Sequence, residues 1–247
     1  MNTYPNNYKV SSTQRQIEIL NETFPKLKIS NVMIPELHPK GEGLFIIPHW
    51  LQIAETYPEA VQKVLNALEK SRPFYNYRSG EIDADHLQQM PSKEAFWKSR
   101  PKESICLSAQ FGMLHKGKSV ENVRESTKTD ELLLGAYEVG IMLLTNPKRL
   151  QAYEDLWIDC PGDMHAPGAG RVFSKAPIFY FYVGKLKFDT DDVSLVSDDY
   201  GSASGFLPQL ASDIAPRKLE SFGSLTLELS EIVLEIKGER YQLKKIN

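Results

Sequence analysis

The clearest helical pattern along the chain lies between residues 58 and 70, where apolar and polar positions recur with the period of a helix. The apolar stripe consists of Val61, Val64, Leu65 and Leu68. Such a stripe is typical of a helix that covers a protein core. Pro58 suits the first turn because its missing N–H would have no partner there. Weaker patterns of the same kind predict helices over residues 12–24, 83–89, 92–98 and 119–126.

A second long stretch, residues 131–145, is apolar nearly all the way round a helical wheel. Its apolar residues run from Leu132 through Ile141 to Leu144. A helix without a polar face lies in the interior of a protein. The pattern therefore predicts a buried helix over residues 131–145.

Short continuous apolar runs predict buried strands at residues 44–47 and 156–158. Another strand is predicted over 104–110, and strands over 178–183 and 185–188 are predicted to form a hairpin around Gly184. Three more strands are predicted, at residues 225–229, 232–236 and 241–246. Loops or turns are predicted where Gly, Pro, Ser or Asp predominate, in residues 161–170, 189–192 and 198–205.

These elements predict an α+β protein with a helix-rich N-terminal two-thirds, which holds a few buried strands, and a strand- and hairpin-rich C-terminal third. We expect a single globular domain over residues 1–247. Its three parts are an N-terminal helix and connection (1–42), a helical part (43–160) and a β-rich part (161–247). A chain of 247 residues is long enough to bury a sizeable core.

The composition excludes several classes of protein. With 29 basic and 32 acidic residues the net charge is −3, which gives no general reason to bind nucleic acid. No run of about 18 apolar residues is present, so no membrane partner is expected. Two cysteines, Cys106 and Cys160, are too few for a secreted disulfide scaffold, and the polar start of the chain lacks an apolar signal segment. We therefore expect a cytoplasmic protein with reduced cysteines.

One motif indicates nucleotide binding. Residues 112–119 match the P-loop pattern, in which backbone N–H groups surround phosphate oxygens. In this interpretation Gly112 and Gly117 shape the loop, Lys118 reaches the terminal phosphates and Ser119 binds Mg²⁺. No cofactor is predicted otherwise, and Mg²⁺ is implied only under this alternative.

Other features of the sequence oppose a P-loop. The preceding strand carries Ser108 and Gln110, which are polar for the central strand of a parallel sheet. Only one long helix follows, whereas a nucleotide-binding sheet needs several strand–helix units. We therefore expect an ordinary basic loop with Lys118 in solvent.

The segment from Asp159 to His165 places two carboxylates, a thiol and an imidazole directly after a buried strand. Loops at strand ends are common places for binding sites. Cys160 and His165 are candidates for a nucleophile and its base, and Asp159, Asp163 and His165 for a divalent-metal site. The segment can also bind a polar ligand or be a purely structural loop. We expect it to line the main polar pocket, with the pKa of His165 raised by the two carboxylates.

Residues 135–150, 153–160 and 199–206 resemble a group of bacterial proteins of uncharacterised function. The likeness runs from about residue 43 to residue 206. It implies a bacterial or mobile-element origin and one globular family domain. It implies no activity, substrate or catalytic residue.

The sequence therefore favours a ligand-binding protein whose pocket is formed by Asp159, Cys160, Asp163 and His165. A first alternative is binding or hydrolysis of ATP or GTP through residues 112–119. A second is a metal-dependent or Cys/His hydrolase at the Cys160 loop. No C-x-x-C or H-E-x-x-H signature is present, so no catalytic residue or metal ligand is assigned, and whether the protein is an enzyme stays open.

Overall fold

The computed structural model describes residues 4–5, 8–168, 170–207, 232–236 and 239–243. The chain divides into two units, Met1–Pro208 and Gln209–Asn247. The second unit contains an antiparallel pair of strands, β12 (Ile232–Ile236) and β13 (Glu239–Leu243). This pair confirms two of the predicted C-terminal strands, whereas the strand predicted at 225–229 lies outside the described residues.

Helices and strands alternate through the first unit. Its helices are α1 (Thr13–Thr23), α2 (Tyr57–Ser71), α3 (Pro91–Lys98), α4 (Val120–Ser126) and α5 (Ala136–Thr145), with 3₁₀ turns η1 (Trp50–Gln52) and η2 (Met113–His115). The helices predicted at 12–24, 58–70, 92–98 and 119–126 are confirmed. The N-terminus of α2 is fixed by a capping box, in which Thr56 and Glu59 each accept the backbone N–H of the other.

One sheet of the first unit has four strands and is antiparallel throughout. Its order is β1 (Gly43–Ile47), β4 (Ile105–Gln110), β11 (Ser204–Phe206) and β5 (Glu131–Leu133). The predicted strands at 44–47 and 104–110 are confirmed.

The other sheet has seven strands and is mixed. A path of five consists of β10 (Tyr200–Ser202), β6 (Trp157–Asp159), β8 (Lys175–Tyr182), β7 (Asp163–His165) and β3 (Leu87–Gln89). Beside β8 lies β9 (Lys185–Asp192), and beside β9 lies β2 (Phe74–Asn76). The β8–β9 pair is the predicted hairpin, and Val183 and Gly184 form its turn with φ angles of 49° and 71°.

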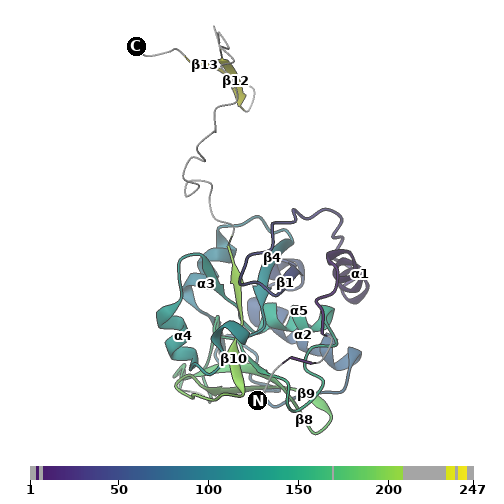
Figure 1. The fold of residues 1–247 in the computed structure, drawn as a ribbon, viewed down its shortest axis with the longest axis vertical. Coiled ribbons are helices and arrows are strands. Elements are labelled where there is room, and N and C mark those ends of the chain that lie inside the picture. The colour runs from purple at the N-terminus through teal and green to yellow at the C-terminus, as the bar shows by residue number, and fades with distance from the viewer. Residues whose placement is uncertain (1–3, 6–7, 169, 208–231, 237–238, 244–247) are drawn as a thin grey trace. The chain divides into compact units, whose positions relative to one another are not determined.

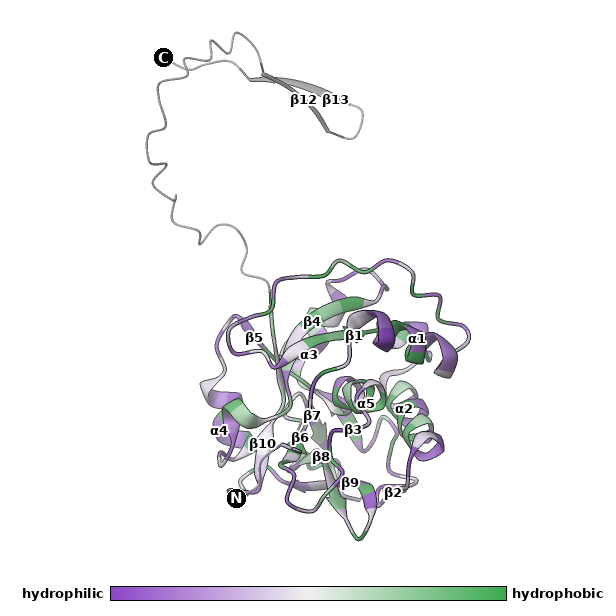
Figure 2. Cartoon of the chain, turned by 45° about the vertical axis from the view of Figure 1, so that its right-hand side comes forward, coloured by the Kyte–Doolittle hydropathy of each residue, from purple (hydrophilic) through white to green (hydrophobic). Residues whose placement is uncertain are grey.

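Helices α5 and α2 lie between the β1–β4 side of the molecule and the β8–β9 side (Figure 1). Every residue of α5 is buried. Gly140 of α5 lets Val64 of α2 approach closely, and Phe179 of β8 packs nearby. Figure 2 shows hydrophobic residues on α2 and α5 and hydrophilic ones on the outer turns of α1 and α4. The core is therefore built around α5, against which both sheets and α2 pack.

The prediction of an α+β protein with a helix-rich N-terminal two-thirds is wrong, because the first unit has a mixed α/β arrangement. Strands β1 to β7 all lie between residues 43 and 165 of the described chain. Each sheet also joins segments that are distant in the sequence. In one sheet β11 lies between β4 and β5, and in the other β10 lies beside β6. Several of these strands have only three residues, which is too short to show a period in the sequence. The single domain over 1–247, with its parts 1–42, 43–160 and 161–247, stays a prediction.

The predicted helix over residues 131–145 is in fact two elements, β5 followed by α5. Gly135 begins the helix, and its N–H donates to Glu138 Oε2 at 2.9 Å. The predicted burial is confirmed for α5 and for Leu132 and Leu133 of β5. A continuous apolar run does not distinguish a buried strand from a buried helix, which explains the error.

Other boundaries were also predicted wrongly. The expected helix at 83–89 is a turn followed by β3, and Asp83 accepts N–H groups within that turn. The expected loops at 161–170, 189–192 and 198–205 contain β7, the end of β9, and β10 with part of β11. Gly201 shows why β10 has no strand signature: a Cβ there would collide with the backbone of Gly112, so close packing requires the small residue.

Candidate functional site

The segment from Asp159 to His165 does not act as one unit, because its side chains have different surroundings. Asp159 ends β6, whereas Asp163 and His165 lie on β7. Among the described residues these three side chains share no hydrogen bond or ion pair with one another. These side chains therefore have separate surroundings and partners.

Asp163 belongs to a fully buried ionic network. Its Oδ1 accepts Lys93 Nζ at 2.6 Å, and its Oδ2 accepts the hydroxyl of Tyr57 at 2.6 Å and the N–H of Ala136 at 2.7 Å. Lys93 Nζ also donates to Glu138 Oε2 at 3.0 Å. Burial raises the pKa of Asp163, against the opposing effect of Lys93.

This network holds the start of α5 in place. Asp163 accepts the first N–H of the helix, and Glu138 accepts the N–H of Gly135 and the indole N–H of Trp97 at 2.7 Å. Negative charge at a helix N-terminus is favourable because of the helix dipole. Since every polar group named here has a partner and none is accessible to solvent, Asp163 has a structural role.

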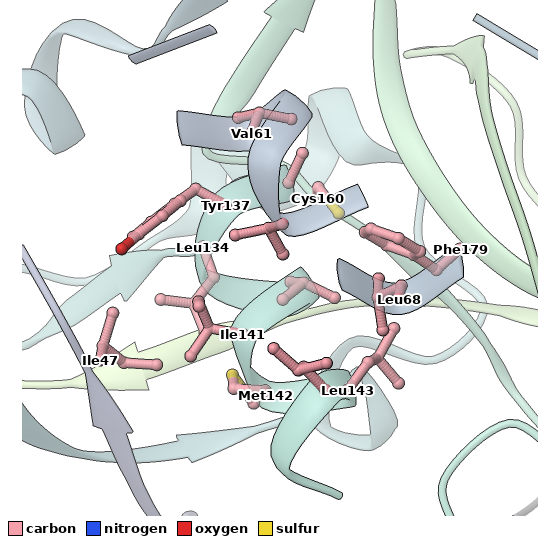
Figure 3. Packing of buried hydrophobic residues seen from close by; sticks show 14 of the residues in the cluster. Ile47, Val61, Leu68, Leu134, Tyr137, Ile141, Met142, Leu143, Cys160 and Phe179 are labelled. Carbon is pink, nitrogen blue, oxygen red and sulfur yellow. The ribbon is translucent and has the colours of Figure 1, made fainter. Parts of the chain in front are cut away.

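Cys160 and His165 are both buried. Figure 3 shows the sulfur of Cys160 among the apolar side chains of the core. Burial raises the pKa of Cys160 well above its ordinary value, which disfavours the thiolate needed for nucleophilic attack. The prediction of a raised pKa for His165 is wrong: burial lowers it, although Glu81, 3.7 Å from Nε2, acts in the opposite direction.

Residues 112–119 adopt a loop whose amides are already occupied. From Gly112 to Lys118 every backbone N–H donates to a group of the protein. The preceding strand β4 has only antiparallel neighbours among the described strands, and η2 lies within the loop. Lys118 is exposed, as expected, and Ser119 caps α4 by accepting the N–H of Asn122 at 3.2 Å. No N–H of residues 112–118 is left to surround a phosphate.

The same loop supports β10. Gly112 has a φ of +125°, and a Cβ there would lie 2.5 Å from the carbonyl oxygen of Gly201. Gly117 donates its N–H to the carbonyl of Tyr200 at 3.0 Å. Gly112 is therefore required for close contact between the loop and a strand, whereas Gly117 provides a positive φ of +76° within the loop.

Asp159 lies on the face of the seven-stranded sheet that points away from α5. Ile158 and Phe179 of the adjoining positions are buried in the core, and alternation places Trp157 and Asp159 on the opposite face. Asp159 pairs in register with Ile178 of β8 and Ser202 of β10.

A hydrogen bond crosses the sheet above Asp159. The hydroxyl of Tyr200, on β10, donates to Asp191 Oδ2, on β9, at 3.3 Å. Strands β6 and β8 lie between β10 and β9 in the sheet, so this contact spans the strand that carries Asp159. Asp159 itself is only 4% exposed.

Three polar groups in this region lack hydrogen-bond partners among the described residues. No donor reaches the carboxyl of Asp159, whose pKa is raised to about 7 by burial and by the negative charge of Asp191. The buried atoms Trp157 Nε1 and Ser202 Oγ also have no partner. Unpaired buried polar groups are uncommon, and their clustering is a reason to consider a ligand.

Aromatic rings surround this group. Trp157 is stacked between Tyr180 and Tyr200, with ring centres 4.3 and 5.0 Å apart. Tyr153 meets Trp157 edge to face and contacts Tyr182, and both tyrosines are about half exposed. The aromatic row therefore extends from solvent towards Asp159. We call Asp159, Asp191, Trp157, Tyr200 and Ser202 the Asp159 site.

The charge around the Asp159 site is negative. After burial, Asp191 and Asp159 are the charged side chains that raise the pKa of Tyr200. Two cations on the same face have other partners, since Arg78 pairs with Asp189 at 2.6 Å and Lys187 lies over the ring of Tyr75. The site therefore lacks a counter-charge from these residues.

Sequence reasoning found Asp159 but missed the other four members of the site. The alternation of Tyr180 with Tyr182 and of Trp157 with Asp159 was a usable signal for a polar, aromatic face. The order of strands in the sheet brings Tyr200 of β10 close to Asp191 of β9. This order cannot be predicted from the sequence. Among the described residues, no group of three or more His, Cys, Asp or Glu side chains is arranged to hold a metal ion.

Comparison with known proteins gives no homologue: no protein-family model, no curated protein and no solved structure matches the chain. Within the described part of the chain, no helix combines the length and apolar character needed to cross a membrane.

Proposed function

We propose that the protein binds a small protonated amine at the Asp159 site. The environment of the Asp159 carboxyl is the observation that carries this proposal. It is almost fully buried, receives no donor from the described residues, and has another carboxylate, Asp191, as its interacting charge. A buried charge is costly unless it is paired. An ammonium group supplies both a positive charge and three N–H donors.

The surrounding groups narrow the ligand class. Aromatic rings attract cations over their electron-rich faces, not at their electron-poor edges. The unpaired Trp157 Nε1 can donate to an acceptor on the ligand, and Ser202 Oγ can donate or accept. An amine that also carries hydroxyl groups, such as an amino alcohol or an amino sugar, satisfies all of these groups together.

This proposal keeps the ligand-binding function expected from the sequence and moves its site. Asp159 remains, whereas Asp163 and His165 are not part of it. A cytoplasmic location also belongs to the proposal, and the free thiols of Cys106 and Cys160 are consistent with it. The bacterial origin suggested by the resemblance stays a prediction.

Matched ligand pairs test the proposal. Ethanolamine and ethylene glycol differ in one amino group, as do glucosamine and glucose. Calorimetric titration at pH 8 should give binding by at least one amine and none by its neutral counterpart at about 10 mM. Asp159→Asn should weaken amine binding by about tenfold or more, while Asp192→Asn, an exposed neighbour of Asp191, should not. Equal binding of amine and neutral partner, or no binding by either amine, would refute the proposal.

A further inference from the structure

Strand β2 lies at an edge of the seven-stranded sheet, and one side of it has no neighbouring strand. Its only strand partner among the described residues is β9. Strands β8 and β9 separate it from β6, which carries Asp159. An edge strand presents unpaired N–H and C=O groups, to which another extended chain can be added. The free side of β2 can therefore pair with a further strand.

The hydrogen bonds between β2 and β9 show which residues face this free side. The carbonyl of Pro73 accepts the N–H of Leu186 at 3.0 Å, and Tyr77 donates its N–H to the carbonyl of Phe188 at 2.9 Å. In a parallel pair, alternate residues of a strand bond to the same neighbour. Positions 73, 75 and 77 therefore bond to β9, whereas the backbone groups at positions 74 and 76 point to the free side.

A groove with a volume of about 360 Å³ runs along this side. Phe74, Tyr75 and Asn76 all line it. Successive side chains of a strand point to opposite faces of a sheet, so a groove that contacts all three residues lies at the edge of the strand. The opposite wall belongs to helix α2, which lies next to β2 (Figure 2). The groove is therefore bounded by the free edge of β2 and by one face of α2.

The walls of the groove define what fits it. Leu65 and Phe74 are buried and apolar, and they provide an apolar floor. Gln62 and Asn66 add amide groups. Glu69 is the only charged residue among the described residues that line the groove, and its exposed carboxylate has no ion-pair partner among them. The groove thus combines free backbone groups, an apolar floor and one unpaired negative charge.

We propose that the groove between β2 and α2 binds an extended peptide segment of a partner protein, which adds to β2 as a further strand. The peptide backbone pairs with the N–H and C=O groups of Phe74 and Asn76, the mode of recognition that main-chain hydrogen bonds provide at sheet edges. Alternate side chains of the peptide face α2. One is apolar and packs on Leu65, and the next is Lys or Arg and pairs with Glu69. The proposal does not depend on amine binding at the Asp159 site.

The probes are blocked pentapeptides with the sequence Lys-Thr-X-Thr-Lys, in which X is Val, Leu or Phe. Their symmetric pattern fits both parallel and antiparallel addition to β2. At least one should bind the full chain with a dissociation constant below about 1 mM, and its Glu-Thr-X-Thr-Glu counterpart should bind about tenfold more weakly or not at all. Bound peptide should protect the amides of Phe74 and Asn76 from hydrogen exchange in NMR spectra. The amide of Tyr77, which already bonds to β9, should not change.

Two variants of one residue isolate the backbone contribution. Asn76→Pro removes an N–H on the free side without removing a bond to β9. Asn76→Ala loses the same side chain, including the acceptor for Arg78 N–H, but retains the N–H. Peptide binding by Asn76→Pro should be at least about tenfold weaker than by Asn76→Ala. If Asn76→Pro does not fold, N-methylation of the peptide replaces it. Methylating either the X amide or the two Thr amides should abolish binding for one of these sets only, since alternate amides face β2.

A further pair of variants tests the charge. Glu69→Gln should weaken binding of the Lys peptide by about fivefold or more, whereas Glu125→Gln, an exposed carboxylate of α4, should leave it unchanged within about twofold. Absence of binding by every Lys peptide at about 10 mM would overturn the proposal, as would equal binding by Asn76→Pro and Asn76→Ala. Protection of the Phe74 and Asn76 amides at high protein concentration without peptide would show that a second copy of the chain occupies the edge, and would also overturn it.

Discussion

At the scale of single residues, Asp159 and Asp163 show how neighbours four positions apart acquire different roles. Asp163 is fully buried but has Lys93, Tyr57 and the first N–H of α5 as partners. Asp159 is nearly as buried and has none of these compensations. In the sequence both carboxylates follow the same predicted buried strand, so both are expected to lie near the end of that strand. The sequence does not predict which of them is paired, because Lys93 comes from a distant helix.

The raised pKa of Asp159 makes stability depend on pH. Its folded pKa of about 7 exceeds the ordinary value of 3.8, so the folded protein binds the additional proton between these pH values. The contribution of Asp159 to stability is present below about pH 4 and is lost as the pH rises through 7. Asp159→Asn removes this loss. Chemical denaturation should show the variant gaining stability relative to the parent between pH 4 and 8, on the order of 2–4 kcal/mol.

An exposed carboxyl provides the control for this titration. Asp199→Asn, one residue before Tyr200, should change stability by less than about 0.5 kcal/mol at every pH. A pH-independent difference between Asp159→Asn and the parent would show that Asp159 is an ordinary carboxyl.

Removal of Asp163 should be strongly destabilising. Asp163→Ala leaves Lys93 with Glu138 as its only remaining carboxylate partner among the described residues, and it removes the acceptor for Ala136 N–H. Breaking a buried ion pair costs about 3–5 kcal/mol. Urea denaturation measures the change. The control is Asp85, which forms an exposed ion pair with Arg171. Asp85→Ala should lower the free energy of unfolding by less than about 1 kcal/mol. Similar losses of stability in both variants would contradict a structural role for Asp163.

At the scale of elements, the sequence predicts the helices well and the short strands poorly. α2 was predicted from its apolar stripe, and its core-facing residues Val61, Val64, Leu65 and Leu68 are buried as expected. The strands β10 and β11 were predicted as a loop, since they consist largely of Gly and Ser. Their place in the sheets depends on close contact with Gly112 and Leu107, and such long-range packing leaves no periodic pattern.

The loop over residues 112–119 should not bind nucleotides. Lys118→Ala should change the free energy of unfolding by less than about 0.5 kcal/mol, because this side chain is exposed. Thermal shift with and without magnesium–ATP should be the same for the parent and the variant. Micromolar ATP binding by the parent that is lost in Lys118→Ala would instead establish a P-loop.

The contact between this loop and β10 should be sensitive to one methyl group. Gly112→Ala combines a positive φ with a collision against Gly201, so it should cost clearly more than about 1 kcal/mol. Gly80 also has a positive φ of +87°, but a Cβ there meets nothing within 4 Å. Gly80→Ala therefore measures backbone strain alone. Equal losses for the two variants in urea denaturation would show that the Gly112–Gly201 contact is unimportant.

At the scale of the whole first unit, the proposed binding site depends on how strands from distant parts of the sequence meet. Asp159 comes from β6, Asp191 from the hairpin strand β9, and Tyr200 and Ser202 from β10. The candidate residue Asp159 was predictable from its position after an apolar strand. The rest of the site was not, because sheet order and register decide it.

The most direct measurement of the central claim is carbon-13 NMR titration of the Asp159 carboxyl with and without ethanolamine. Comparison with Asp159→Asn assigns the signal. The pKa should be near 7 in the free protein and should fall by about one unit or more with bound amine, because a nearby positive charge favours the carboxylate. A carboxyl that titrates near 4 in the free protein, or whose pKa does not change with saturating amine, would contradict amine binding at the Asp159 site.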